Sequence, residues 1–217
     1  SDGELIIQAE AALDADEAFT VIVAYGGTAS QLANPTSFAS LGWIPTRDGF
    51  AALGEPSGSS SWYPVNEHPL DKATYTFELT VADPLVAVAN GTLESVTEAD
   101  GRSTYTWQMN DLMASYLAVL SVGDYTLDES TSADGTIIRN YFPTRLATSG
   151  AEAFVNQGEM VDYFSSIFGS YPFEEYGALV IDANIGFALE TQTISTFGPR
   201  IITGTLAGDQ QGGEGTI

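Results

Sequence analysis

The sequence contains no cysteine and only one histidine, His68, among its 217 residues. Without cysteine, neither a disulfide framework nor a thiolate site can form. A catalytic zinc site usually takes three protein ligands, often two of them histidines, so this chain cannot supply such a site by itself. His68 precedes Pro69 in a polar turn, and no G-x-S-x-G motif is present, which argues against a Ser-His-Asp triad.

Basic residues are scarce as well. Six Lys and Arg stand against 29 Asp and Glu, which gives a formal net charge of -23. Nucleic-acid binding depends on clustered basic side chains, so nucleic acid is excluded as a partner, and docking on anionic lipid is disfavoured. The acidic charge does not identify the cellular compartment, and it favours a high-salt or extracytoplasmic setting only weakly.

Long apolar runs are also missing. No stretch approaches the roughly 20 apolar residues of a membrane-spanning helix, so no membrane-spanning segment is expected. The hydrophobic content of 44% is that of a globular chain. The sequence starts SDGELIIQAE, without an initiator Met or a signal-type segment, which suggests a processed or cut piece.

Alternating apolar residues predict strands through the first two thirds of the chain. The alternation is clearest from Ala73 to Val81, where apolar residues share one face and Thr or Glu the other, and a shorter alternation runs from Phe19 to Tyr25. Turn dipeptides such as Asn90-Gly91 separate further strand candidates, namely Leu85 to Ala89, Thr104 to Met109, Tyr116 to Tyr125 and Thr136 to Phe142. This spacing predicts a β-sandwich or curved antiparallel sheet for roughly the first 145 residues.

After Pro143 the pattern changes to that of a helix. An apolar stripe contains Phe154, Val161, Phe164 and Phe168, with Met160 and Ile167 at its margin. Ser149 and Glu152 have the spacing of a capping box, and Gly169 is placed to end the helix. Two further strands are expected, at Ala178 to Ile181 and within Gly186 to Phe197. From Thr203 onward the glycine-rich sequence predicts a mobile loop or frayed end.

Two acids, Glu55 in LGEPSG and Glu190 in FALETQ, stand out as candidates for chemistry. Taken alone, each is most simply a solvated acid or a turn residue. A pair of carboxylates can also act as general acid and base, or bind calcium or another cation. The pattern of the residues by itself leaves these alternatives open.

Several segments in order resemble the zinc aminopeptidases of the aminopeptidase N type, which are gluzincin metallopeptidases. They are GEPSGSSSWYPVNEHPLDKATYTFELTV, TYTWQMNDLMASYLAVLSVGDY and YFSSIFGSYPFEEYGALVI. FALET then falls on the family's Gly-Ala-Met-Glu-Asn motif, with Ala188 on Ala, Leu189 on Met and Glu190 on Glu. Thr191 in place of Asn and Phe187 in place of Gly depart from the motif.

The resemblance implies a mainly β fold with an α+β tail. An antiparallel β-sandwich or saddle-like N-terminal domain, residues 1–145, would be followed by the start of a thermolysin-like catalytic domain, residues 146–217, with both domains incomplete. Glu190 and Glu55 would bind the α-ammonium of a peptide substrate, and the backbone near Ala188 and Leu189 would pair with the peptide main chain.

The same resemblance implies zinc in the full-length enzyme, held by an H-E-x-x-H helix that would follow residue 217. Neither a catalytic residue nor a metal site is expected within this chain, which would be inactive alone. Its expected partners are peptide substrates and the rest of the catalytic domain. The competing hypothesis is a non-catalytic acidic β-sandwich that binds a protein, glycan or calcium at the cell surface.

Overall fold

Three β-sheets form the framework of the computed structural model, which describes residues 5–9, 11–29, 31–32 and 41–203. The first sheet has the order β1-β2-β3-β8-β5, and all of its strands pair antiparallel. Its strands are β1 (Gln31–Leu32), β2 (Leu41–Pro45), β3 (Phe50–Leu53), β8 (Leu120–Gly123) and β5 (Val86–Ala89). The second sheet is also antiparallel, in the order β4-β7-β6, and consists of β4 (Lys72–Ala82), β7 (Arg102–Ala114) and β6 (Thr92–Ala99).

The third sheet is mixed and has the order β12-β13-β11-β10-β9. Its strands are β9 (Tyr125–Thr131), β10 (Ile137–Pro143), β11 (Glu175–Val180), β12 (Ala188–Glu190) and β13 (Ser195–Phe197). Strands β10, β11 and β13 run parallel, whereas the two outer strands pair antiparallel. Parallel neighbours need a long crossover, and α1 (Ala147–Ala153) and α2 (Gln157–Phe168) provide it between β10 and β11.

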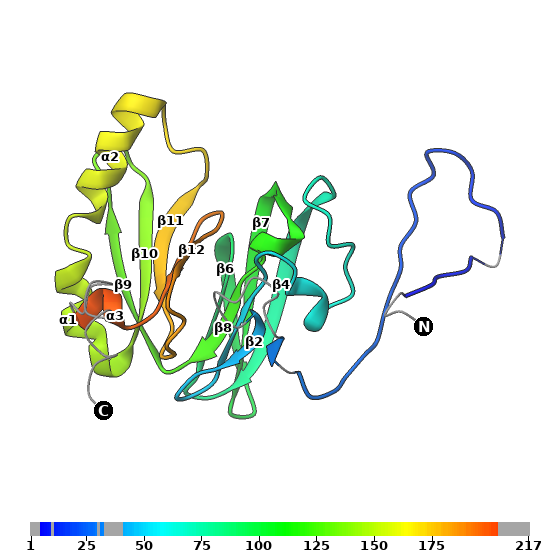
Figure 1. The fold of residues 1–217 in the computed structure, drawn as a ribbon, viewed down its shortest axis with the longest axis horizontal. Coiled ribbons are helices and arrows are strands. Elements are labelled where there is room, and N and C mark those ends of the chain that lie inside the picture. The colour runs from blue at the N-terminus through cyan, green and yellow to red at the C-terminus, as the bar shows by residue number, and fades with distance from the viewer. Residues whose placement is uncertain (1–4, 10, 30, 33–40, 204–217) are drawn as a thin grey trace, which may run out of the picture.

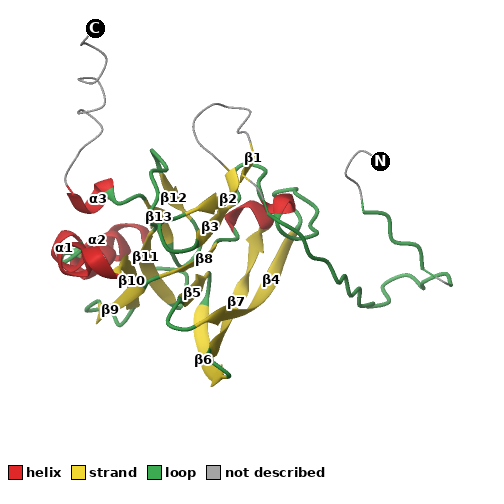
Figure 2. Ribbon diagram, turned by 90° about the horizontal axis from the view of Figure 1, so that it is seen from below, coloured by secondary structure: helices red, strands yellow, loops and turns green. Residues whose placement is uncertain are grey.

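Short helical turns complete the described part of the chain: η1 (Ser59–Ser61), η2 (Ser115–Leu117), η3 (Thr144–Leu146) and α3 (Arg200–Thr203). Figures 1 and 2 show α1 and α2 on one side of the third sheet, with the first two sheets on its other side. None of the described helices is long and apolar enough to cross a membrane.

A continuous core joins the three sheets. Trp107 of β7 and Tyr141 of β10 meet edge-on with ring centroids 6.0 Å apart, and the Trp107 indole N–H donates to the Ala87 carbonyl at 3.1 Å. The core therefore runs from the second sheet into the third. The third sheet combines strands from before and after residue 145, and the division into domains at that residue stays a prediction.

The antiparallel, mainly β fold expected from the sequence is confirmed. Strand β4 follows the predicted alternation, because Phe77 is buried while Thr76 and Glu78 on the opposite face are exposed. β5, β7 and β10 likewise coincide with predicted strands. The expected strand from Tyr116 to Tyr125 is divided, since η2 precedes β8 and Tyr125 begins β9, which belongs to a different sheet.

The strand expected from Phe19 to Tyr25 is wrong. This segment forms no strand, and its apolar side chains are exposed, with Phe19 at 66% and Ile22 at 90%. Alternation states which face could be buried, but it does not provide a partner strand. The Tyr25 hydroxyl donates to the carbonyl of Trp62, which follows η1, at 3.0 Å.

The single helix expected after Pro143 is two helices, broken at residues 154–156. Ser149 lies inside α1 and caps nothing, because that helix starts at Ala147 after Leu146. Val161 is buried, but Phe164 and Phe168 in the same helix are 54% and 80% exposed, so the expected stripe is not buried along its length. Gly169 ends α2 as predicted, with a φ of +97°. The glycine-rich segment expected to be mobile lies, after Thr203, outside the described residues.

Candidate functional site

Strand β12 carries Glu190 at the edge of the third sheet. Leu189 is 2% exposed and points into the core, whereas Ala188 and Glu190 on the opposite face are exposed. β13 pairs with one edge of β12, and no described strand pairs with the other. An edge strand of this kind offers backbone N–H and C=O groups to an extended peptide.

The loop after Glu190 is fixed from both sides. Residues 191–194 connect β12 to β13, and the Thr191 amide donates to the Ile194 carbonyl at 3.3 Å. The Asn90-Gly91 turn, which joins β5 to β6, reaches this loop through hydrogen bonds to Thr191, Gln192 and Thr193. The short strand of Glu190 is thus attached to the first two sheets as well as to its own.

Glu55 lies in the turn that follows β3, and its side chain is exposed. The residues after it are held firmly. The Glu67 carboxylate accepts hydrogen bonds from the Ser59 amide at 2.5 Å and from the Ser60 hydroxyl at 2.8 Å. The Ser59 hydroxyl donates to the Ser115 carbonyl at 2.7 Å, so the Glu55 turn is anchored on residues 115–119.

Strands β12 and β13 with the loop between them, residues 188–197, form a hairpin, called here the Glu190 hairpin. The segment 115–119 is connected to this hairpin through Asn90. A Cβ built at Gly54 would lie 2.6 Å from the Tyr116 carbonyl oxygen, which shows how closely the Glu55 turn packs against this segment. On the other side, the Val119 amide donates to the Asn90 side chain at 2.7 Å, and Asn90 in turn contacts Thr191. Two acid-bearing turns that are 135 positions apart in sequence therefore share one supporting segment.

Neither the Glu55 nor the Glu190 carboxylate takes part in a hydrogen bond or ion pair within the described part of the chain, although the backbone of Glu190 pairs with β13. The sequence motifs pointed to Ala188, Leu189 and Glu190. They do not point to Asn90, because the dipeptide Asn90-Gly91 predicts only a turn. Its full burial, 0% exposed, is what distinguishes it from an ordinary turn asparagine.

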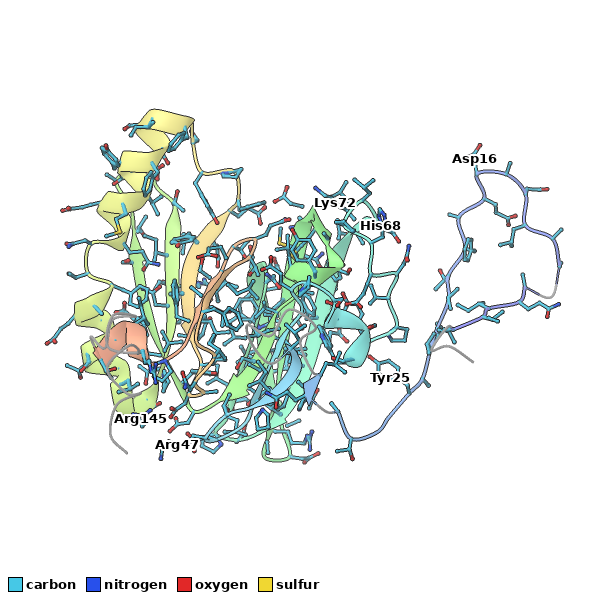
Figure 3. All side chains as sticks on the ribbon, in the orientation of Figure 1. Asp16, Tyr25, Arg47, His68, Lys72 and Arg145 are labelled. Carbon is cyan, nitrogen blue, oxygen red and sulfur yellow. The ribbon has the colours of Figure 1, made fainter. Side chains whose placement is uncertain are left out.

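The most strongly paired carboxylate is Asp182, just after β11. It accepts hydrogen bonds from Arg145 and from Arg47, and Figure 3 shows these two arginines close together at the same end of the molecule. These bonds, that of Arg145 above all, hold the pKa of Asp182 below its ordinary value. Asp182 is thus already neutralised by protein groups, in contrast to Glu55 and Glu190.

The described residues do not fit a zinc ion. Among them, no three His, Cys, Asp or Glu side chains are grouped so as to hold a metal. His68 sits in a turn, where its Nδ1 accepts the Leu70 amide at 3.2 Å. No chemical step can be assigned to a metal on these residues.

The family model of the peptidase M1 N-terminal domain matches residues 1–117. The chain belongs to the peptidase M1 family. Among solved structures, this M1 chain is similar to an M1 zinc metallopeptidase variant from Deinococcus radiodurans bound to a Tyr-Ser-Ala substrate. The two share 27% identity with a TM-score of 0.71, over 79% of this chain and 40% of the other. A variant of a two-domain M1 zinc metallopeptidase bound to L-arginine matches with 27% identity, a TM-score of 0.69 and the same coverage.

Curated aminopeptidases are also similar to this chain. Aminopeptidase M1 of Arabidopsis thaliana is 25% identical over 66% of this chain and 16% of its own length. Aminopeptidase N of Acetobacter pasteurianus is 26% identical over 60% of this chain and 37% of its own length. The M1 chain described here thus corresponds to well under half of either relative.

Proposed function

We propose that this chain acts within a zinc-dependent aminopeptidase, where it holds the N-terminus of a peptide substrate. The proposal rests on the placement of the two acids. Glu190 lies on a strand whose outer edge no described strand pairs with, and Glu55 lies on a turn that packs against residues 115–119, the segment to which Asn90 connects the Glu190 hairpin. Family membership and the likeness to zinc metallopeptidases support the reaction class. Hydrolysis of the first peptide bond is accordingly the proposed activity of the whole enzyme.

An aminopeptidase must distinguish a free α-ammonium from an internal amide. Two unpaired carboxylates do so, because each can accept charge-assisted hydrogen bonds from the ammonium group. We assign Glu190 and Glu55 to this role. The exposed edge of β12, at Ala188 and Leu189, would pair with the peptide main chain as an added strand, which aligns the substrate without reading its side chains.

Zinc, and the remainder of the catalytic domain as a partner, are proposed for the whole enzyme and not for this chain. We expect the 217-residue protein to show no stoichiometric zinc binding by calorimetry and no turnover of an aminoacyl chromogenic substrate. Tight zinc binding or metal-dependent hydrolysis by this protein would refute that expectation.

The recognition role can be tested on the 217-residue protein directly. Titration of isotope-labelled protein with Tyr-Ser-Ala should shift the amide resonances of residues 188–190, and an N-acetylated copy of the peptide should not. Glu190→Gln and Glu55→Gln should each weaken binding about tenfold, the usual effect of losing one charge-assisted hydrogen bond. Glu98→Gln, an exposed acid on β6, is the matched control. Equal binding of the acetylated peptide would contradict the proposal.

In the whole enzyme, Glu190→Gln should lower kcat/KM, because both substrate and transition state lose an anchor for the ammonium group. An unchanged kcat/KM would remove Glu190 from the proposed site. Loss of selectivity for a free N-terminus in both assays would instead favour a non-catalytic binding module.

A further inference from the structure

The side chain of Asn90 is fully buried and uses both ends of its amide. Its Nδ2 donates to the Thr191 hydroxyl at 3.2 Å and to the Gln192 carbonyl at 2.9 Å. Its Oδ1 accepts the Val119 amide at 2.7 Å. A primary amide has two donor hydrogens and one acceptor oxygen, so this side chain is committed to three contacts on two separate segments.

The neighbouring residue makes a fourth contact with the same loop. The Gly91 amide donates to the Thr193 hydroxyl at 2.8 Å. Thr193 is buried and has a φ of +68°, a left-handed conformation that β-branched residues rarely adopt. A strained residue persists where its surroundings hold it, and here the Asn90-Gly91 turn supplies hydrogen bonds to Thr193 and to both residues before it.

The position of Glu190 depends on this loop. β12 is three residues long, and Glu190, opposite Ser195, is its last residue before the loop. So short a strand has few bonds of its own to define its direction. The register with β13 and the burial of Leu189 turn Glu190 outward, and the loop conformation adds a second constraint on its position.

The acceptor end of Asn90 acts on the other acid-bearing region. By fixing the Val119 amide it fixes residues 115–119, and Ser115 accepts the hydrogen bond from Ser59 in the segment after Glu55. A single side chain thus connects the loop that follows Glu190 with residues 115–119, on which the Glu55 turn is anchored.

We propose that Asn90 is a positioning residue that sets the Glu190 hairpin relative to Glu55. The proposal rests on the proposed function in assigning ligand recognition to these two acids. Asn90 touches no substrate in this scheme, and it acts through Thr191, Gln192 and Val119.

The decisive variant is Asn90→Asp in the 217-residue protein. It keeps the shape of the side chain and an oxygen for the Val119 amide, but it replaces the donor facing Thr191 and Gln192 by an acceptor. The matched control is Asn140→Asp. Asn140 is 2% exposed, its Oδ1 accepts the Ala178 amide at 3.0 Å, and it lies in β10, which β13 and β11 separate from β12 in the sheet.

Two measurements separate positioning from stability. In Asn90→Asp, hydrogen exchange of the Thr191 amide should accelerate at least about tenfold relative to that of Val119, because only the hairpin side loses its hydrogen bonds. Affinity for Tyr-Ser-Ala should fall by about the same factor. Asn140→Asp should lower the melting temperature while both readouts stay within about twofold of the unmodified protein. If Asn90→Asp does not fold, Thr191→Val should reproduce the exchange effect, since it removes the hydroxyl that accepts from Asn90 and also donates to the Ile194 carbonyl.

Equal exchange of Thr191 in Asn90→Asp and the control would overturn the proposal, as would equal peptide affinity. If the unmodified protein does not bind the peptide, the proposed recognition role fails. The exchange of Thr191 relative to Val119 then still decides whether Asn90 holds the hairpin.

Discussion

The carboxylate of Asp182 accepts two parallel hydrogen bonds from Arg145, at 2.7 Å from Nε and 2.6 Å from Nη2. This bidentate geometry is the strongest form of an arginine–carboxylate pair. Arg47, in the turn between β2 and β3, adds a third bond at 3.0 Å. Because Asp182 follows β11 and Arg47 belongs to the first sheet, the cluster connects the first sheet to the third.

Asp182→Asn should destabilise the protein at neutral pH by about 1 to 2 kcal/mol, since charge-assisted bonds to partly solvated arginines are weakened. The pKa of Asp182 is lowered in the folded state, so its contribution is present above the unfolded-state pKa of about 3.9 and is lost as the pH falls through the folded-state value. Thermal unfolding should thus show a gap between the two proteins at pH 7 that closes in acid.

Asp111→Asn, at an exposed position in β7, serves as the control for loss of one negative charge. In a chain of net charge -23 that loss alone can stabilise, so the comparison is with this variant rather than with the unmodified protein. A gap between the two variants that persists unchanged as the pH falls well below the unfolded-state pKa of about 3.9 would contradict the assignment to the Asp182 carboxylate.

Gly91→Ala should be strongly destabilising. Gly91 has a φ of +91°, and an added Cβ would lie 2.1 Å from the Gln108 carbonyl oxygen, so the turn and β7 would have to separate. We expect a loss above about 2 kcal/mol in urea unfolding, combining backbone strain with this steric overlap. Gly101→Ala is the control, because Gly101 has a φ of +72° but no heavy atom within 4 Å of the added Cβ. It should cost only about 1 kcal/mol, and equal losses would show that the close approach to Gln108 is unimportant.

Leu189→Ala should lower stability by about 2 to 3 kcal/mol, because a fully buried leucine leaves a cavity. The melting temperature should fall by roughly 5 to 10 °C for a chain of this length. Leu189→Met, which preserves side-chain volume, should cost less than about 1.5 kcal/mol. A large loss in the methionine variant would mean that the shape of the pocket for residue 189 matters more than its volume.

The sequence predicts the elements whose side chains alternate over a long stretch, as β4 illustrates. It fails at Phe19 to Tyr25, because burial needs a partner strand that no local pattern specifies. It also fails in α2, because the predicted helical stripe spans a break at residues 154–156. There, five apolar residues at helical spacing, from Met160 to Phe168, remain exposed. Local periodicity describes an element, not what covers it.

For the candidate site, the sequence indicates which residues are candidates but not how the fold holds them. Glu190, Glu55, Ala188 and Leu189 came from short motifs, and their roles stay predictions. The link through Asn90 joins residues about 100 positions apart, and the pairing of Arg47 with Asp182 spans 135 positions. Contacts at such separations arise from sheet topology, which the strand patterns left undetermined.

The inward side chain of Leu189 also fixes the register of β12. A shift of one residue against β13 would turn Leu189 to solvent and bury Ala188 or Glu190 instead. Burial of an unpaired carboxylate costs several kcal/mol, so the slipped arrangement is suppressed. Burial of the apolar residue next to the acid therefore selects the pairing register of the strand in which Glu190 faces outward.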